Sequence, residues 1–276
     1  MSLRRALSAL IPSGAVREFL RVGTYNWKFR GRARFSRAGE RYVTQFPSGK
    51  FETLQAAYGI RELLDVYERR HKILPGDVIL DVGAHHGSVL LALAVLTGPN
   101  GLVIGLEPDD QNRQVLLQNL AFNTNLGNIR LVSDALWDRI TTIDFFERGS
   151  LGSSALWDGP SSEKKTKQTV TLDVLAERFE LMRLDLVIMN AEGAELKAFA
   201  GGERVLRELR PEFAIASNHF VDGKYTYETV ERELRSRGYD AETVWHNKEE
   251  CVTFGTPQRP HLERSMSATR CMSSAE

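Results

Sequence analysis

The chain has 276 residues, of which 42% are hydrophobic and 26% charged, and its formal net charge is zero. This composition is typical of a globular protein with one sizeable core, or with one core and an appended segment. No apolar stretch approaches the roughly twenty residues of a membrane span, and no signal-peptide pattern is present. Two cysteines, Cys251 and Cys271, are too few for a disulfide framework. We therefore expect a cytoplasmic protein.

The first fifty residues are strongly basic. They hold eleven lysine or arginine residues against two acidic ones, Glu18 and Glu40. Apolar residues at helical spacing (Leu3, Leu7, Leu10 and Ile11) precede a break at Pro12. We interpret residues 1–50 as a basic N-terminal extension. It could lie on an anionic membrane surface at the cell periphery or on another polyanion, or it could simply pack on the rest of the chain.

Residues 51–74 carry apolar residues at steps of three and four, which predicts a helix that ends before Pro75 and Gly76. Such a helix would cover an edge of a sheet and could close over a ligand.

The segment from Val78 to Leu96 predicts a strand, a tight turn and a helix. Gly83 and Gly87 let a ligand approach the main chain of the turn, and the free N–H groups of the following helix point to the same place. Asp81 lies just before the turn. Glu107 ends the next predicted strand, 102–106, in a position that commonly binds the ribose hydroxyls of a nucleoside cofactor.

The glycine spacing distinguishes between cofactor classes. Dinucleotide-binding folds use G-x-G-x-x-G, whose middle glycine makes room for a pyrophosphate. This chain has G-x-x-x-G, with His85 where the middle glycine would be needed, and Asp81 would repel a diphosphate. An acidic residue there suits a ligand with an amino group and a sulfonium, S-adenosyl-L-methionine. We predict that Ala84 and His85 bind this cofactor together with Asp81, Gly83, Gly87 and Glu107.

The alternation of strands and helices continues to about residue 254. A helix is expected from about Asp110 through Leu120, ending near Asn123 to Gly127, followed by a strand at 129–132. Asp134 and Ala135, at the end of that strand, are predicted near the adenine amino group, although a loop acid on the surface fits the spacing of Asp134 equally well. The remaining predicted elements are hairpin strands at 142–146 and 168–172, helices at 173–179, 195–209 and 227–237, and strands at 185–189, 213–216, 241–245 and 251–254.

This alternation predicts a doubly wound, Rossmann-like α/β domain over residues 51–256, with helices on both faces of the sheet. Residues 257–276 show no periodicity, and we expect a disordered tail.

Several short motifs follow one another along the chain. They are D-V-G-A-H-H-G at 81–87, E-P at 107–108, A-L-W-D at 135–138, G-S-S at 152–154, T-L-D at 171–173 and E-G-A-E at 192–195. In these motifs and their order, over about residues 50–255, the sequence resembles the FkbM family of S-adenosylmethionine-dependent methyltransferases. The resemblance implies a class I methyltransferase sheet whose last strand is antiparallel, and a small-molecule acceptor such as a sugar or polyketide hydroxyl.

The catalytic candidates lie at later strand ends. His219 is predicted as the general base, since an imidazole titrates near neutrality and the family often has a histidine at this strand end. It could instead merely hydrogen-bond a loop. Glu192 is the second candidate, as an orienting carboxylate or a partner of His219. Asn190 and Ala191 stand where the family usually has Asp and Val; because an amide cannot act as a base, we assign Asn190 the orientation of a substrate hydroxyl and predict no metal.

Two other function classes remain open from the sequence. Asn190 is compatible with a protein that binds the cofactor without turnover. A nicotinamide-dependent oxidoreductase would share the fold, but the missing middle glycine disfavours it. The fold alone does not choose between these functions, and the sequence does not specify the acceptor or the oligomeric state.

Overall fold

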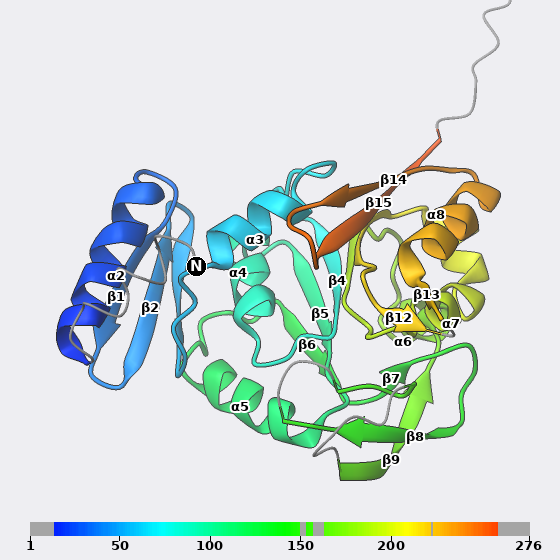
Figure 1. Ribbon diagram of the computed structural model, residues 1–276, viewed down its shortest axis with the longest axis horizontal. Helices are drawn as coiled ribbons and strands as arrows, with labels where there is room; N and C mark the ends of the chain where they lie inside the picture. Colours follow the sequence, from blue (N-terminus) through cyan, green and yellow to red (C-terminus); the bar gives the residue numbers. More distant parts are fainter. Residues whose placement is uncertain (1–13, 150–152, 157–162, 222, 259–276) are drawn as a thin grey trace, which may run out of the picture.

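The computed structural model describes residues 14–149, 153–156, 163–221 and 223–258. Its centre is a seven-stranded sheet with the strand order β14-β15-β11-β10-β4-β5-β6 (Figure 1). These strands are β4 (Val78–Val82), β5 (Leu102–Leu106), β6 (Ile129–Val132), β10 (Leu186–Met189), β11 (Glu212–Ala216), β14 (Tyr239–Trp245) and β15 (Cys251–Pro257). The neighbouring strands β11, β10, β4, β5 and β6 pair in parallel, whereas β15 is antiparallel to both of its neighbours, β11 and β14. The predicted α/β fold and its antiparallel last strand are confirmed.

Helices cover both faces of the sheet, because its central strands are apolar on both sides. Along β4, Ile79 packs into the core on one face and Leu80 into the core on the other. The first face is covered by α3 (Ile60–Tyr67), α4 (Ser88–Thr97) and α5 (Asp110–Ala121). The second is covered by α6 (Leu172–Arg178), α7 (Glu195–Ala200), the π-helical turn η1 (Val205–Leu209) and α8 (Thr226–Ser236).

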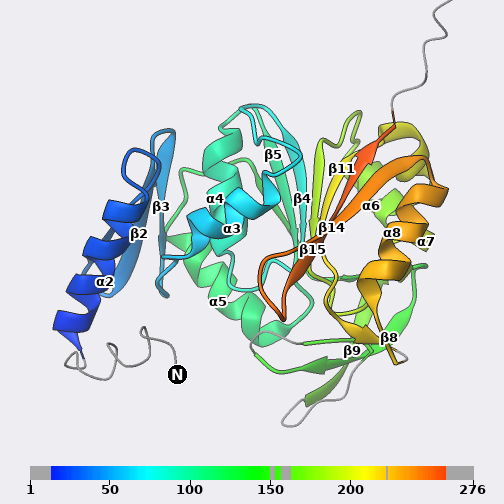
Figure 2. The ribbon, with the colours of Figure 1, turned by 45° about the horizontal axis from the view of Figure 1, so that its top comes forward.

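The N-terminal part has more regular structure than the sequence predicted. Helix α2 (Ala15–Lys28) lies along a three-stranded antiparallel sheet of β1 (Arg34–Ala38), β2 (Arg41–Phe46) and β3 (Gly49–Thr53), at one end of the molecule (Figures 1 and 2). We call these four elements the N-terminal unit. Its buried phenylalanines, Phe35, Phe46 and Phe51, belong to the same core as the helices α3 and α4.

The helix predicted over residues 51–74 is shorter than expected, since α3 spans Ile60–Tyr67. Phe51 lies in β3 opposite Thr44 of β2, and both side chains are buried, so strand pairing overrides the helical spacing there. Residue 50, our predicted boundary, therefore lies inside a strand. The division of the chain into an extension and a catalytic domain stays a prediction.

Smaller strands lie beyond the carboxyl ends of the central strands. The predicted hairpin is present as β8 (Thr142–Glu147) and β9 (Glu163–Val170), and β9 also pairs with β7 (Ala135–Leu136). A second, short hairpin consists of β12 (Phe220–Val221) and β13 (Lys224–Tyr225). Within the described ranges, no helix is long and apolar enough to cross a membrane. The apolar positions at Leu3 to Ile11 and the predicted tail from 259 onward lie outside the described residues.

Candidate active site

The turn after β4 brings two strand ends into contact. Gly83 has φ 84°, and a Cβ atom built there would lie 2.4 Å from the carbonyl oxygen of Asn190, which follows β10. Only glycine both adopts this positive φ readily and leaves room for the Asn190 carbonyl. The segments that follow β4 and β10 can therefore approach each other closely. Gly87 has a different structural role. It is the N-cap residue of α4 and adopts a left-handed conformation.

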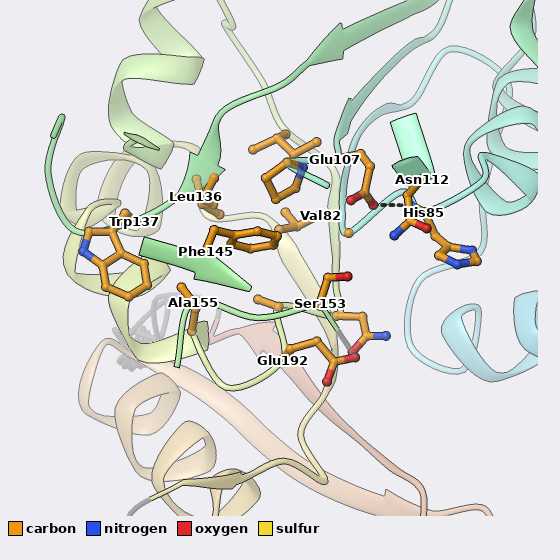
Figure 3. Close-up of a pocket in the computed structure, with 17 residues that line it drawn as sticks. Val82, His85, Glu107, Asn112, Leu136, Trp137, Phe145, Ser153, Ala155 and Glu192 are labelled. Atoms are coloured by element: carbon orange, nitrogen blue, oxygen red, sulfur yellow. Dashed lines mark hydrogen bonds between the residues drawn. The ribbon is translucent and has the colours of Figure 1, made fainter. Parts of the chain in front are cut away.

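Glu107 holds the turn from the neighbouring strand. Its Oε2 accepts a hydrogen bond from the backbone N–H of His85 at 2.6 Å (Figure 3), and its Oε1 accepts one from the N–H of Asp109 at 2.9 Å. The side chain of Asn112 also donates to this carboxylate, which can still accept a further bond. Burial raises the pKa of Glu107 to about 7, although these hydrogen bonds act in the opposite direction.

Asp81 is buried on β4 beside this arrangement. Its Oδ2 has no hydrogen-bond partner within the described part of the chain. Burial, and then the charge of Glu107, raise the pKa of Asp81 to about 7. A buried carboxylate without a partner costs free energy, so this site favours a cationic ligand that would compensate it.

Two cavities adjoin at Gly83. The Glu107 cavity is lined by Val82, Gly83, His85, Leu106, Glu107, Pro108, Asn112, Ala135, Leu136, Trp137, Phe145, Ser153, Ala155, Asn190, Ala191, Glu192 and Ala194 (Figure 3). The Asp81 cavity is lined by Ala56, Ala57, Gly59, Ile60, Leu63, Tyr67, Asp81, Val82, Gly83, Ala84, His85, Ser88, Val89, Ile188 and Asn190. Val82, Gly83, His85 and Asn190 line both, so one elongated ligand could occupy the two cavities together.

Further polar atoms in this region lack partners. Asn190 Oδ1 and His85 Nε2 are buried and have no hydrogen-bond partner among the described residues. Burial and the stacked ring of His86, 3.7 Å away between centroids, lower the pKa of His85 to about 4, which keeps its imidazole neutral. Buried polar atoms of this kind usually have a partner, and here a bound ligand would supply it.

The side chain of Asp109 links the start of α5 to the segment that contains Arg148, Gly149 and Ser153. Its Oδ1 caps α5 by accepting from the N–H groups of Gln111 and Asn112. Its Oδ2 accepts from Ser153 Oγ at 2.6 Å and from the N–H groups of Arg148 and Gly149. These bonds outweigh burial and hold the pKa of Asp109 below its ordinary value. One carboxylate thus fixes Ser153 at the wall of the Glu107 cavity.

His219 is held by carboxylates on the other side of the site. Its Nδ1 lies 2.9 Å from Glu195 Oε1, and its Nε2 lies 3.7 Å from Glu192 Oε2. The ring N–H is not aimed at Glu195, so that contact is mainly electrostatic. Burial alone would lower the pKa of His219, but the two carboxylates outweigh it and raise the pKa above 6.5. Glu192 lines the Glu107 cavity, whereas His219 is not one of its lining residues.

The structure brings most of the predicted cofactor residues together. Asp81, Gly83, Ala84, His85, Glu107 and Ala135 line one cavity or both. Gly87 lines neither. Asp134 lines neither cavity, and its carboxylate faces Arg178 of α6 at 3.5 Å, whereas the following Ala135, Leu136 and Trp137 line the Glu107 cavity. Its contact with the adenine amino group stays a prediction.

Several site residues escaped the sequence analysis. Leu136, Trp137 and Phe145 form the apolar side of the Glu107 cavity, and Asn112 reaches it from α5. The sequence analysis included Glu195 only as the last residue of the motif E-G-A-E and assigned it no role. The strand-like alternation around Phe145 was a signal for burial, but not for a place in this cavity.

The sequence comparison identifies the family. A family model described as "Methyltransferase FkbM domain" matches residues 81–241, which include Asp81, Glu107, Glu192 and His219. The chain belongs to the FkbM methyltransferase family. The predictions of the family and of S-adenosyl-L-methionine as the cofactor are therefore confirmed, and a nicotinamide-dependent oxidoreductase is no longer a candidate.

Relatives of known name agree with this membership. The chain is 27% identical over 167 residues to the 2-O-methyltransferase NoeI of Sinorhizobium fredii, a match that covers 54% of this chain and 65% of NoeI. The crystal structure of a methyltransferase FkbM from Methylobacillus flagellatus has a TM-score of 0.51 and 20% identity, and covers 67% of this chain and 45% of that one. The chain thus spans less than two thirds of the length of either relative. At this identity the structural match shows the fold alone.

The side chains of this FkbM methyltransferase fit the cofactor. S-adenosyl-L-methionine has ribose hydroxyls that can donate to Glu107 and an ammonium and a sulfonium that suit the unpaired Asp81. In such a complex the ribose would lie at Glu107 and the amino-acid part at Asp81, in the two cavities that adjoin at Gly83. The ammonium would supply the partner that Asp81 Oδ2 lacks among the described residues.

Proposed function

We propose that this methyltransferase transfers the methyl group of S-adenosyl-L-methionine to a hydroxyl group of a small-molecule acceptor. The observation that carries the proposal is the imidazole of His219, held between Glu195 and Glu192, of which Glu192 lines the Glu107 cavity. A hydroxyl nucleophile needs a base for its proton, and an imidazole held by a carboxylate is suited to that task. The name of NoeI, a 2-O-methyltransferase, supports the same chemistry.

The cofactor supplies a methyl group activated by the sulfonium. In the proposed complex Glu107 accepts hydrogen bonds from the ribose hydroxyls, and Asp81 in its ionised form accepts from the ammonium. Phe145 and Leu136 would pack on the adenine from the covering sheet. The protein then aligns the acceptor oxygen with the methyl group and excludes water, which is the main contribution expected for a displacement of this kind.

The proton of the acceptor goes to His219. The charge of the buried Glu195, 2.9 Å from Nδ1, favours hydrogen on Nδ1 through electrostatic attraction, which would leave the Nε2 lone pair for the hydroxyl. Glu192 lines the cavity and lies near Nε2, so it can orient the hydroxyl and stabilise the imidazolium that forms. Asn190, with its free buried Oδ1, is assigned to positioning and not to proton transfer.

An aromatic cluster beside His219 suggests how the acceptor is held. Phe220, directly after His219, packs edge-on against Tyr225, which packs edge-on against Trp245. All three side chains are exposed, and the neighbouring Val221 packs against Gly193 of the Glu192 loop. Exposed aromatic faces suit a ring with an apolar face, such as a sugar or polyketide ring. We assign the acceptor to this side of the site.

Incubation with radiolabelled S-adenosyl-L-methionine and a panel of sugar, polyketide and phenolic acceptors tests the proposal. Transfer of label to a hydroxyl, lost in the His219→Ala variant, is the expected result. Binding of S-adenosylhomocysteine without transfer to any acceptor of the panel would favour the alternative of a cofactor-binding protein without turnover. Label on nitrogen or carbon of an acceptor would contradict O-methylation.

A further inference from the structure

Helix α2 has two apolar faces, and only one of them is buried. On the inner face, Val22 and Tyr25, with Phe29 just after the helix, pack into the buried core. Tyr25 stacks on Tyr58 and on Phe29, and it meets Phe35 edge-on. Packing in the core therefore accounts for the apolar residues of the inner face.

The outer face of α2 is apolar as well. Val16, Phe19, Leu20 and Trp27 recur at steps of three, four and seven residues, which places them on one side of the helix. Their side chains are exposed, Phe19 to 77% and Trp27 to 81%. We call these four residues the outer stripe. Because α2 lies at the outer edge of the molecule (Figures 1 and 2), no described segment covers the stripe.

Cations accompany the outer stripe. Arg17 and Arg21 follow Val16 and Leu20 directly in the sequence and so line one flank of the stripe on the helix. Lys28, which follows Trp27, pairs with Glu62 of α3. Residues 14–53 contain nine lysine or arginine residues against three acidic ones. Two of those acids face partners within the protein, Glu18 the hydroxyl of Tyr58 and Glu52 the side chains of Arg41 and Lys50. Arg32 likewise pairs with Asp65 of α3. The N-terminal unit nevertheless contains more cations than acids, so its net charge is positive.

We propose that the outer stripe of α2 docks on the surface of an anionic lipid bilayer. The positive charge is complementary to anionic headgroups, and an apolar stripe flanked by cations is the pattern of helices that lie in the membrane interface. Tryptophan suits this boundary, since its ring is apolar and its N–H remains among the headgroups. A nucleic acid or another polyanion would use the cations but leave Phe19 and Leu20 without a partner, so the stripe favours lipid.

The test uses the full chain, because a form that starts near residue 51 would cut β3. Flotation with vesicles of phosphatidylcholine alone, and of phosphatidylcholine with 30 mol% phosphatidylserine, measures binding at low and at high salt. We expect binding only to the anionic vesicles, and weaker binding at high salt. The Phe19→Ser/Trp27→Ser variant should bind at least about tenfold more weakly. Met182→Ser, at an apolar side chain 92% exposed elsewhere on the molecule, is the matched control and should bind like the wild type.

Two further measurements make the result specific. Binding of S-adenosylhomocysteine by the stripe variant should equal that of the wild type, which separates this proposal from the proposed function and shows that the variant folds. Retention on heparin should persist in the stripe variant, because its cations are unchanged.

Equal vesicle binding by the stripe variant and the wild type would overturn the proposal. So would binding of the full chain to heparin but not to anionic vesicles, which would identify a polyanion as the partner. A change from dimer to monomer on substitution of the stripe, without vesicle binding by the wild type, would identify a second copy of the chain instead.

Discussion

Glu195 lies 2.9 Å from Nδ1 of His219, and its carboxylate is completely buried. A buried carboxylate in contact with an imidazole stabilises the protonated ring and fixes its orientation. If His219 is the base, Glu195 is a positioning residue whose charge should be visible in the pH dependence of the reaction.

We expect His219→Ala to lower kcat by about a hundredfold or more, since general-base catalysis is typically worth that much. Affinity for S-adenosylhomocysteine should change little, because His219 lines neither cavity. The control is His246→Ala, which removes an exposed imidazole at the end of β14. Wild-type turnover in His219→Ala would move the role of base to Glu192.

Replacement of Glu195 by glutamine removes the charge and keeps the shape. In the wild type the base is active only above the raised pKa of His219, so kcat should rise with pH through a value above 6.5. In Glu195→Gln this rise should move to lower pH, with a fall in the plateau of about tenfold. Measurement of kcat between pH 5 and 9 distinguishes this from a structural role, which would lower kcat without moving the profile.

Asp81 and Glu107 should both contribute to cofactor affinity. Loss of a charge-assisted hydrogen bond at either position is expected to cost about 1.5 to 3 kcal/mol, or roughly ten- to more than a hundredfold in Kd. Titration of Asp81→Asn and Glu107→Gln with S-adenosylhomocysteine by calorimetry measures this. Asp144→Asn is the matched control, because this exposed carboxylate of β8 pairs with Lys164 and lines neither cavity. Unchanged affinity in both site variants would contradict the assignment.

Cofactor binding should release protons near neutral pH. Burial raises the pKa values of Asp81 and Glu107 to about 7, from ordinary values of 3.8 and 4.5. The folded, ligand-free protein therefore holds protons that the unfolded chain has lost, and its stability falls as the pH rises from about 4 to about 7. A cationic ligand favours the ionised carboxylates, so binding at pH 6.5 should expel protons. Calorimetry in two buffers of different ionisation enthalpy would detect them, and Asp81→Asn should reduce their number.

Asp109→Asn should destabilise both the start of α5 and the wall formed by Ser153. An amide has only one accepting oxygen, so either the cap or the contacts to Arg148, Gly149 and Ser153 are lost. We expect a loss of about 1 to 3 kcal/mol in the free energy of unfolding. Urea denaturation provides the measurement. Asp110→Asn, at the adjacent half-exposed residue, should change it much less.

The features that the sequence predicted best are those that depend on local backbone geometry. Gly83 and Gly87 located the turn, the apolar runs located the central strands, and the position of Glu107 after its strand placed it in the site. These features depend on backbone conformation and burial within one strand–turn–helix unit, which a linear pattern records.

Features that depend on distant contacts could not be predicted in this way. Asp134 ends a strand as expected, but Arg178 on a distant helix decides where its side chain lies. Glu195 acts on His219 across 24 positions of sequence, and no spacing rule connects them. In the N-terminal unit the density of arginines concealed the burial of Phe35, since on β1 the other four side chains are exposed.

The shared core of the N-terminal unit has a consequence for unfolding. Phe35, Phe46 and Phe51 are buried in the same cluster as Leu64 of α3 and Leu91 of α4, so no aqueous boundary separates the unit from the central sheet. Two parts that bury one another's apolar surface melt together. Denaturant should therefore unfold the described chain in a single cooperative transition, and amide protons of β2 should exchange about as slowly as those of β4.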